Sequence, residues 1–177
     1  CTDSWLEPKP LSFHTPEDTY VGVDGFEATL SACEAEMHDE YNGDGCAILT
    51  EMIQSDICVE GTTDKAGPQM DMDKSLLPDM PLDNMDYTRV GCYWTHGYKA
   101  IKSANIIIAR IDEGKFANEE DKSRILGQAY FHRAYWYYKL VHQFGDIPWL
   151  DYELAEPKTD FYSYDRWSIL EELKRNL

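Results

Sequence analysis

A sustained helical repeat over residues 90–144 constrains the fold of this 177-residue chain more than any other feature. In its first part, apolar and small residues recur at intervals of three and four, which is the spacing of one face of an α-helix. The residues on this face are Val90, Trp94, Gly97, Ile101, Ala104, Ile108 and Ile111. Gly114 is expected to cap the C-terminus of this helix.

A second helix is predicted from Asn118 to Phe144. Asn118 is a favourable N-cap, and the acidic run at 119–121 complements the positive end of the helix dipole. Gly145 is expected to supply a left-handed cap, and Pro148 prevents the helix from continuing. Two long helices with a short connection predict an antiparallel hairpin.

The composition of this hairpin resembles a tetratricopeptide unit, in which a bulky residue and a glycine on the first helix meet small and aromatic residues on the second. The residues expected to face one another here are Trp94, Gly97, Gly127, Phe131 and Ala134. We therefore predict a mainly α fold of irregular tetratricopeptide-like helical pairs, an α-α superhelix with long loops and little or no β structure.

A third helix is predicted over residues 163–177, with Trp167, Leu170 and Leu173 turned inward. Such repeat units bury their faces against their neighbours. We therefore expect the helical domain, residues 15–177, to be the amino-terminal part of a domain that continues beyond the chain end.

The region before residue 90 is less regular. Residues 1–14 contain two prolines and no helical period, which indicates an extended arm, and Thr15 can cap a first helical turn. A helix is predicted from Asp24 and another over residues 46–59. The apolar stripe of the helix from Asp24 comprises Phe26, Leu30, Cys33 and Met37. Residues 61–89 show no sustained period and are predicted to form a variable loop.

The formal net charge of -17 is distributed unevenly along the chain. Residues 1–95 contain 20 Asp and Glu against 4 Lys and Arg, whereas residues 96–177 contain 13 against 12. A polyanionic partner would be repelled, so nucleic-acid binding is not expected. No apolar run reaches the length of about 18 residues that predicts a membrane-spanning helix.

Several segments carry a family resemblance. They are Ala104-Asn105 with the isoleucines that follow, Gly127-Gln128-Ala129-Tyr130-Phe131, Arg133-Ala134-Tyr135, Leu140 and Phe144-Gly145-Asp146-Ile147-Pro148. Further agreement comes from Cys1 with Asp3 and Leu6, from Thr15-Pro16-Glu17 and from Ser55-Asp56. In these segments the chain resembles the RagB/SusD family of nutrient-binding outer-membrane lipoproteins, whose members are roughly three times as long.

This resemblance implies a lipoprotein at the cell surface that binds oligosaccharides and has no enzymatic activity or cofactor. Its implied partner is a SusC-like, TonB-dependent β-barrel transporter of the outer membrane, to which it would deliver the ligand. The lipid anchor, attached at Cys1, would be its sole contact with the membrane, with the protein facing the cell exterior.

Lipidation of Cys1 would leave four other cysteines, Cys33, Cys46, Cys58 and Cys92, which permit three disulfide pairings. The alternative is that some of these are buried free thiols, because Cys33 lies on an apolar stripe. Their spacing matches no zinc site, since no pair is spaced as CxxC.

The residues that carry the resemblance are interpreted as structural. Asn105 is expected to hydrogen-bond a neighbouring backbone group, and Arg133 to pair with a carboxylate while buried or half-buried. Gly127 and Ala134 are expected to permit close helix contact. The aromatic residues at 130–138 are predicted to belong to the core rather than to a glycan platform.

Ligand contacts are instead expected near the end of the variable loop. Tyr87, Arg89 and Tyr93 combine aromatic faces with a charged hydrogen-bond donor, the side-chain types that sugar binding needs. The alternative is a solvated loop with no ligand. Asp71 and Asp73 begin an acidic pattern that fails as an EF-hand, so at most an irregular calcium site is expected and no other metal.

Two other functions remain open. One is a tetratricopeptide-type scaffold that binds proteins or peptides, including a peptide-importing branch of the same family. The other is a glycosidase, for which an abundance of carboxylates is no support without a correctly spaced pair.

Overall fold

The computed structural model describes residues 19–42, 89–154 and 156–177, with side chains of the second range given from residue 93 onward. The helices of this part are α2 (Val23–Asn42), α5 (Arg89–Arg110), α6 (Glu119–Phe144) and α7 (Arg166–Asn176). The strands β1 (Ile147–Pro148) and β2 (Ser163–Tyr164) form a short antiparallel pair. The predicted mainly α fold with little β structure is confirmed. The expected arm 1–14, the helix 46–59 and residues 61–88 of the variable loop lie outside the described residues.

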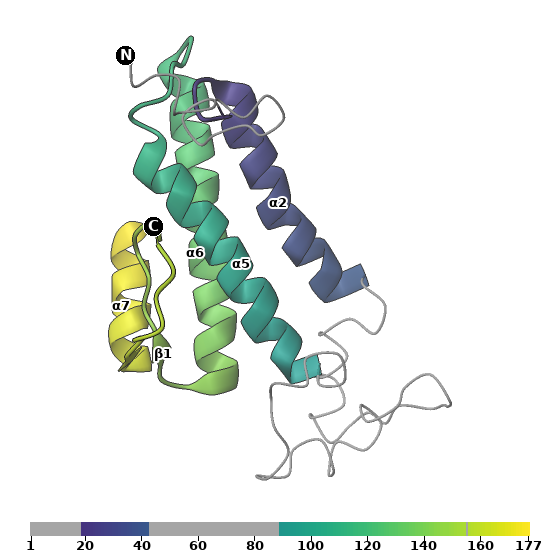
Figure 1. Ribbon diagram of the computed structural model, residues 1–177, viewed down its shortest axis with the longest axis vertical. Coiled ribbons are helices and arrows are strands. Elements are labelled where there is room, and N and C mark those ends of the chain that lie inside the picture. The colour runs from purple at the N-terminus through teal and green to yellow at the C-terminus, as the bar shows by residue number, and fades with distance from the viewer. Residues whose placement is uncertain (1–18, 43–88, 155) are drawn as a thin grey trace, which may run out of the picture.

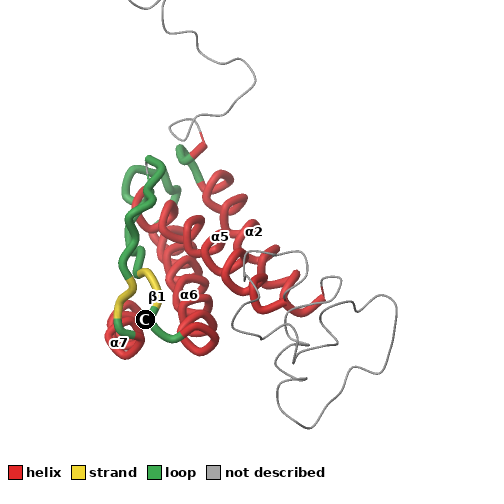
Figure 2. Tube along the Cα trace, turned by 60° about the horizontal axis from the view of Figure 1, so that its bottom comes forward, coloured by secondary structure: helices red, strands yellow, loops and turns green. Residues whose placement is uncertain are grey.

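The three long helices lie side by side, with α5 antiparallel to both α2 and α6 (Figure 1). The short helix α7 packs on α6 at the side away from α2, which is also seen from a second direction in Figure 2. The predicted antiparallel hairpin is therefore present as α5 and α6, and α2 is added to it as a third long helix.

The termini of α6 are as predicted. Asn118 is the N-cap, and its Oδ1 accepts a hydrogen bond of 2.8 Å from the backbone N–H of Asp121. Gly145 follows the last residue with φ 75°, where its N–H donates to the Val141 carbonyl at 3.1 Å. A residue with a side chain would be strained at this positive φ, so glycine is suited to this position.

Helix α5 ends at Arg110, before the predicted cap at Gly114. Gly114 is instead a point of close approach between the connecting loop and α2. A Cβ atom there would lie 2.6 Å from a ring carbon of Phe26. The same loop is tied to the start of α2 by a hydrogen bond of 2.8 Å from the Lys115 N–H to the Val21 carbonyl.

The hydrophobic core has two clusters of buried side chains. One joins the start of α2 to the end of α5 and the start of α6, through Phe26, Leu30, Ile107, Ile111, Ile125 and Ala129. The other joins α5, the end of α6, β1 and α7, and includes Tyr93, Ile101, Trp136, Leu140, Ile147 and Ile169. The predicted stripe on α2 is confirmed, because Phe26, Leu30 and Cys33 are buried and Met37 packs against the second cluster.

The predicted pairing between α5 and α6 is wrong in register. Because the helices are antiparallel, the start of α5 meets the end of α6 rather than its beginning. A Cβ on Gly97 would lie 3.0 Å from Cδ1 of Leu140, and the Trp94 ring contacts Phe144 with centroids 5.1 Å apart. A Cβ on Gly127 would meet no atom within 4 Å, so this glycine does not mediate helix contact among the described residues.

The inward face of α7 also differs from the prediction. Ile169 and Leu173 are buried and Leu170 packs partly against the core, whereas Trp167 is 67% exposed. Asp165 caps this helix by accepting a hydrogen bond of 2.9 Å from the Ser168 N–H. Trp167 therefore lies in the first turn, on the outer side of the helix, with the Arg166 guanidinium over its ring.

Candidate functional site

The segment between β1 and β2 forms one wall of the candidate site. After β1 the chain runs along the helices away from the pair of strands and then returns to β2 (Figure 2). It has almost no regular secondary structure, so its backbone polar groups need partners other than a ladder. Side chains from α5 and α6 supply those partners.

Three side chains fix the start of this segment. The Tyr98 hydroxyl donates to the Pro148 carbonyl at 2.8 Å, and Asn105 Nδ2 donates to the Leu150 carbonyl at 2.8 Å. The Tyr137 hydroxyl accepts from the Leu150 N–H at 2.6 Å and lies 3.1 Å from the Leu150 carbonyl, to which it donates. The prediction that Asn105 bonds a backbone group is confirmed.

Burial keeps the two tyrosines in their neutral, proton-donating form. Desolvation raises the pKa of the Tyr98 hydroxyl, and the neighbouring Tyr137 raises it further. The pKa of Tyr137 is likewise raised, chiefly by its burial. Both hydroxyls therefore remain hydrogen-bond donors throughout the physiological pH range.

Arg133, on α6, also hydrogen-bonds the same segment. Its side chain is 3% exposed, and Nη1 donates to Asn105 Oδ1 at 3.0 Å and to the Asp151 carbonyl at 3.5 Å. The guanidinium also lies over the rings of Tyr130 and Trp149, and burial lowers its pKa. The expected burial is correct, but the expected carboxylate partner is wrong, because an amide and a carbonyl oxygen take that place.

A bidentate ion pair holds the far end of the segment. Nε of Arg110, at the end of α5, lies 2.8 Å from Oε2 of Glu153, and Nη2 lies 2.9 Å from Oε1. Both side chains are largely buried, so this pair is more rigid than a solvent-exposed one. The segment 148–153 is thus attached to α5 along most of its length.

Between this segment and α5 lies a groove of about 390 Å³, which we call the α5 groove. Its wall on α5 is formed by Trp94, Thr95, Tyr98, Lys99, Ile101, Lys102 and Asn105. Its opposite wall is formed by Pro148, Leu150, Tyr152, Leu154 and Phe161. A concave apolar surface of this volume with a few polar groups is typical of small-molecule sites.

Aromatic rings and lysines define the chemistry of the α5 groove. Trp94, Tyr152 and Phe161 are 38%, 45% and 40% exposed, so parts of their rings face solvent. Lys99 and Lys102 are exposed, and neither forms an ion pair among the described residues. No Asp or Glu is among the described residues that line the groove.

Of the three predicted ligand residues, only Tyr93 has a described side chain, and it does not line this groove. Tyr87 is outside the described residues, and Arg89 is the first residue of α5, with a side chain that is not described. Tyr93 is 1% exposed within the core, where the Lys139 ammonium lies 5.9 Å from its ring centroid. Ligand binding by these three residues stays a prediction.

The sequence did contain a signal for the opposite wall. Tyr152 and Phe161 belong to an irregular stretch that is rich in aromatic residues. Because this stretch has no helical period, the sequence pattern did not indicate which surface its side chains form. Periodicity could not place these rings, because the segment follows α5 through side-chain hydrogen bonds rather than through a repeat. The α5 groove was therefore missed.

Another group of buried polar side chains lies between α2 and α6. Glu40 Oε1 lies 3.0 Å from Nζ of Lys139, and the Tyr135 hydroxyl donates to Oε2 of Glu40. Nearby on α6, buried His132 has no hydrogen-bond partner at Nδ1 among the described residues, and burial lowers its pKa. These contacts join helices, so we interpret them as structural.

Cys33 is a free, buried thiol whose Sγ donates to the Ala100 carbonyl at 3.6 Å. The free-thiol alternative is therefore correct for this cysteine, whereas the disulfide state of the others lies outside the described side chains.

Over the described residues, no three His, Cys, Asp or Glu side chains are grouped as a metal site would require. The acidic pattern at Asp71 and Asp73 is not among them.

The outer side of α6 presents exposed aromatic residues. Phe131 and Tyr138 are 50% and 53% exposed, and Tyr130 and Tyr135 are half-buried, whereas Trp136 and Tyr137 are buried. The prediction that the aromatic residues at 130–138 belong to the core is thus correct for Trp136 and Tyr137 and wrong for Phe131 and Tyr138.

None of the helices in the described ranges has the length and apolar character needed to cross a bilayer.

Comparison with known proteins places the chain in a family. Residues 5–175 match a SusD-like family described as "Starch-binding associating with outer membrane". A similar curated protein is SusD-like protein P2 of Formosa agariphila, which is 28% identical over 157 residues. That alignment covers 88% of this chain and 29% of the relative, so the chain spans less than a third of the relative's length. No solved structure matches the chain.

Proposed function

The chain belongs to the SusD-like family, and from this premise we propose that it acts at the cell surface by binding oligosaccharides and delivering them to a SusC-like, TonB-dependent outer-membrane transporter. The observation that carries the proposal is the family match across residues 5–175, which includes nearly all of the described helical part. The role is one of binding rather than catalysis. Attachment to the membrane would be through a lipid on Cys1.

The α5 groove supports a role in sugar binding. A pyranose ring presents an apolar face of C–H groups to an aromatic ring and hydroxyls to polar side chains around it. The groove supplies both kinds of surface, with Tyr152 and Phe161 on one wall and Lys99 and Lys102 on the other. Tyr87, Arg89 and Tyr93 remain proposed contacts for another part of the ligand.

The exposed aromatic residues of α6 suit contact with a protein partner. Phe131 and Tyr138 lie on the outer side of the helical hairpin, and aromatic side chains of this kind are enriched in protein interfaces. A β-barrel transporter is the partner proposed here. The same residues also favour the alternative function, a tetratricopeptide-type scaffold for proteins or peptides.

Two measurements test the proposal. Calorimetric titration of the full-length chain with oligosaccharides is expected to show saturable binding, and Tyr87→Ala is expected to weaken it. Affinity purification of the native protein from outer membranes is expected to recover a large β-barrel. If peptides bind and no oligosaccharide does, the scaffold alternative replaces the proposal.

A further inference from the structure

We propose that the α5 groove binds an acidic sugar unit, with a carboxylate or sulfate ester held between Lys99 and Lys102 and the sugar ring against Tyr152 or Phe161. The inference rests on the proposed sugar-binding function. It adds to that function a location and a charge class for the ligand.

The two lysines are placed to act on one anionic group. They are three residues apart on α5, so they lie on the same side of the helix, and both line the groove. Neither lysine forms an ion pair among the described residues, and Glu153, which lies between the lining residues Tyr152 and Leu154 in sequence, is paired with Arg110. The lysine ammonium groups are thus available to a ligand.

A further lysine lies close to one residue of the opposite wall. Nζ of Lys158 lies 5.8 Å from the ring centroid of Phe161, which itself lines the groove. No acidic residue is in the described lining, so its charged side chains are Lys99 and Lys102, and Lys158 lies beside the lining residue Phe161. A neutral sugar would leave these charges without a counterpart, whereas an anionic one would accept charge-assisted hydrogen bonds from them.

The strongly acidic composition of the whole chain does not oppose this assignment. The excess of acidic residues lies in residues 1–95, with 20 Asp and Glu against 4 Lys and Arg. The groove is formed by residues 94–161, which belong almost entirely to the near-neutral part of the chain. At physiological ionic strength exposed charges are screened over about 8 Å, so the charges that line the groove, those of Lys99 and Lys102, act most directly on a bound ligand.

The size of the groove and its aromatic rings favour a short sugar over a free inorganic anion. A volume of about 390 Å³ far exceeds what a single anion fills, and it lies within the range of small-ligand sites. The partly exposed rings of Tyr152 and Phe161 give the sugar an apolar surface that an inorganic anion would not use.

The test is calorimetric titration of the full-length chain with three oligosaccharides of equal length. These are an oligogalacturonate, which bears carboxylates, a carrageenan oligosaccharide, which bears sulfates, and a neutral malto-oligosaccharide. At least one acidic probe is expected to bind about tenfold more tightly than the neutral one, a difference that decreases at higher salt. The two acidic probes distinguish carboxylate from sulfate.

The double variant K99Q/K102Q is expected to lose about tenfold in affinity for the preferred acidic probe and to leave any neutral binding unchanged. The matched control is K115Q/K174Q, which removes the same charge from exposed positions outside the groove and is expected to change nothing. Circular dichroism of both variants verifies that they fold.

Equal affinity for acidic and neutral probes would overturn this inference while leaving the proposed sugar-binding function intact. An equal loss of acidic-probe affinity in both double variants would overturn it as well, since net charge rather than the groove would be responsible. An acidic peptide that binds as tightly as the preferred sugar would do the same. If no oligosaccharide binds, the proposed function itself fails.

Discussion

Cys33 shows how strongly one position can be controlled by its surroundings. Its thiol is buried between α2 and α5, and the Ala100 carbonyl accepts its hydrogen. Desolvation raises the pKa of the thiol to about 12, and the carboxylates of Glu34 and Glu36 act in the same direction. Because the thiolate is the reactive form, a thiol with this pKa is protected from alkylation.

We therefore expect Cys33 to resist iodoacetamide at pH 8 in the folded protein. A pKa of about 12 instead of 9.0 leaves on the order of a thousandfold less thiolate at that pH. Peptide mapping after labelling measures the reaction at this cysteine alone, with the protein in concentrated urea as the control. Labelling at similar rates in the folded and unfolded protein would contradict the burial of Cys33.

The same pKa gives a sign for alkaline stability. A thiol whose pKa is raised by folding stays protonated in the native state while it ionises in the unfolded state. The unfolded state then binds fewer protons between pH 9 and 12, so the free energy of unfolding contributed by Cys33 decreases as pH rises through this range.

Asn105 and Arg133 show what the sequence can and cannot predict for a single residue. A polar residue beside an apolar stripe must have a hydrogen-bond partner, so burial and a structural role could be inferred for both. The identity of the partner depends on the segment 148–153, which has no periodic pattern. The prediction of a backbone partner for Asn105 was correct, since it donates to the Leu150 carbonyl. The prediction of a carboxylate partner for Arg133 was wrong, since it donates to the Asn105 amide oxygen instead.

At the level of elements, the local sequence determines where α6 begins and ends. The loop between α5 and α6 determines which of their residues face one another. The N-cap of α6 and its end at Phe144 are local properties, and both were predictable from the sequence. The facing residues depend on how the loop from Arg110 to Glu119 folds the helices together. Both Gly97 and Gly127 were expected at the contact between these helices. Only Gly97 lies there, since a Cβ on Gly127 would meet no described atom within 4 Å.

Replacing Gly127 with alanine is expected to stabilise the protein by about 0.5–1 kcal/mol, because glycine is unfavourable inside a helix and nothing described lies within 4 Å of the added Cβ. Gly97→Ala is the matched control. Its Cβ would lie 3.0 Å from Leu140 Cδ1, so a similar gain is not expected there. Urea denaturation followed by circular dichroism compares the two variants.

Destabilisation by Gly127→Ala would show that this glycine is closely packed against something outside the described residues. That result would restore the contact role that the sequence predicted for it. Stabilisation would confirm that the outer side of α6 is open at this position.

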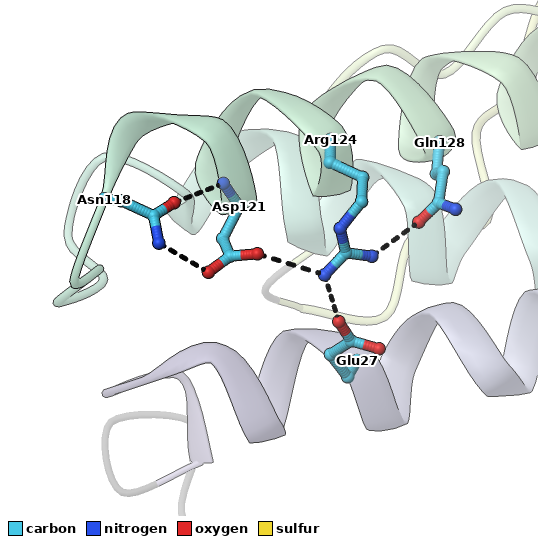
Figure 3. A network of polar contacts seen from close by, with 5 residues as sticks. All are labelled: Glu27, Asn118, Asp121, Arg124 and Gln128. Carbon is cyan, nitrogen blue, oxygen red and sulfur yellow. Dashed lines mark hydrogen bonds and ion pairs between the residues drawn. The ribbon is translucent and has the colours of Figure 1, made fainter.

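For the whole molecule, the question is what attaches α2 to the α5–α6 hairpin. Two glutamates of α2 reach α6, one near each end of the interface. Glu27 pairs with Arg124, which also contacts Asp121 and Gln128 on its own helix, and all of these side chains are at the surface (Figure 3). Glu40 instead is 2% exposed and lies between Lys139 and Tyr135.

These two contacts should differ greatly in energy although both join the same helices. The attraction within an exposed pair is screened by water, and both charges are hydrated whether or not the pair forms, so the pair contributes little to stability. Removing a buried carboxylate takes away an acceptor that water replaces poorly, and here both the Lys139 ammonium and the Tyr135 hydroxyl bind that carboxylate. The side chain of Lys139 is 14% exposed, so its ammonium cannot be fully hydrated once the Glu40 carboxylate is removed.

We therefore expect Glu40→Ala to lower the free energy of unfolding by about 1–3 kcal/mol, whereas Glu27→Ala changes it little. Urea denaturation of both variants, at low and at high salt, measures the difference. Added salt should further reduce the small effect of Glu27→Ala and leave that of Glu40→Ala nearly unchanged, since salt screens exposed pairs far more than buried ones. Equal losses would contradict this difference between a buried and an exposed pair. If both losses were small, the apolar contacts of Phe26 and Leu30 would contribute more to the attachment of α2 than either of these two ion pairs.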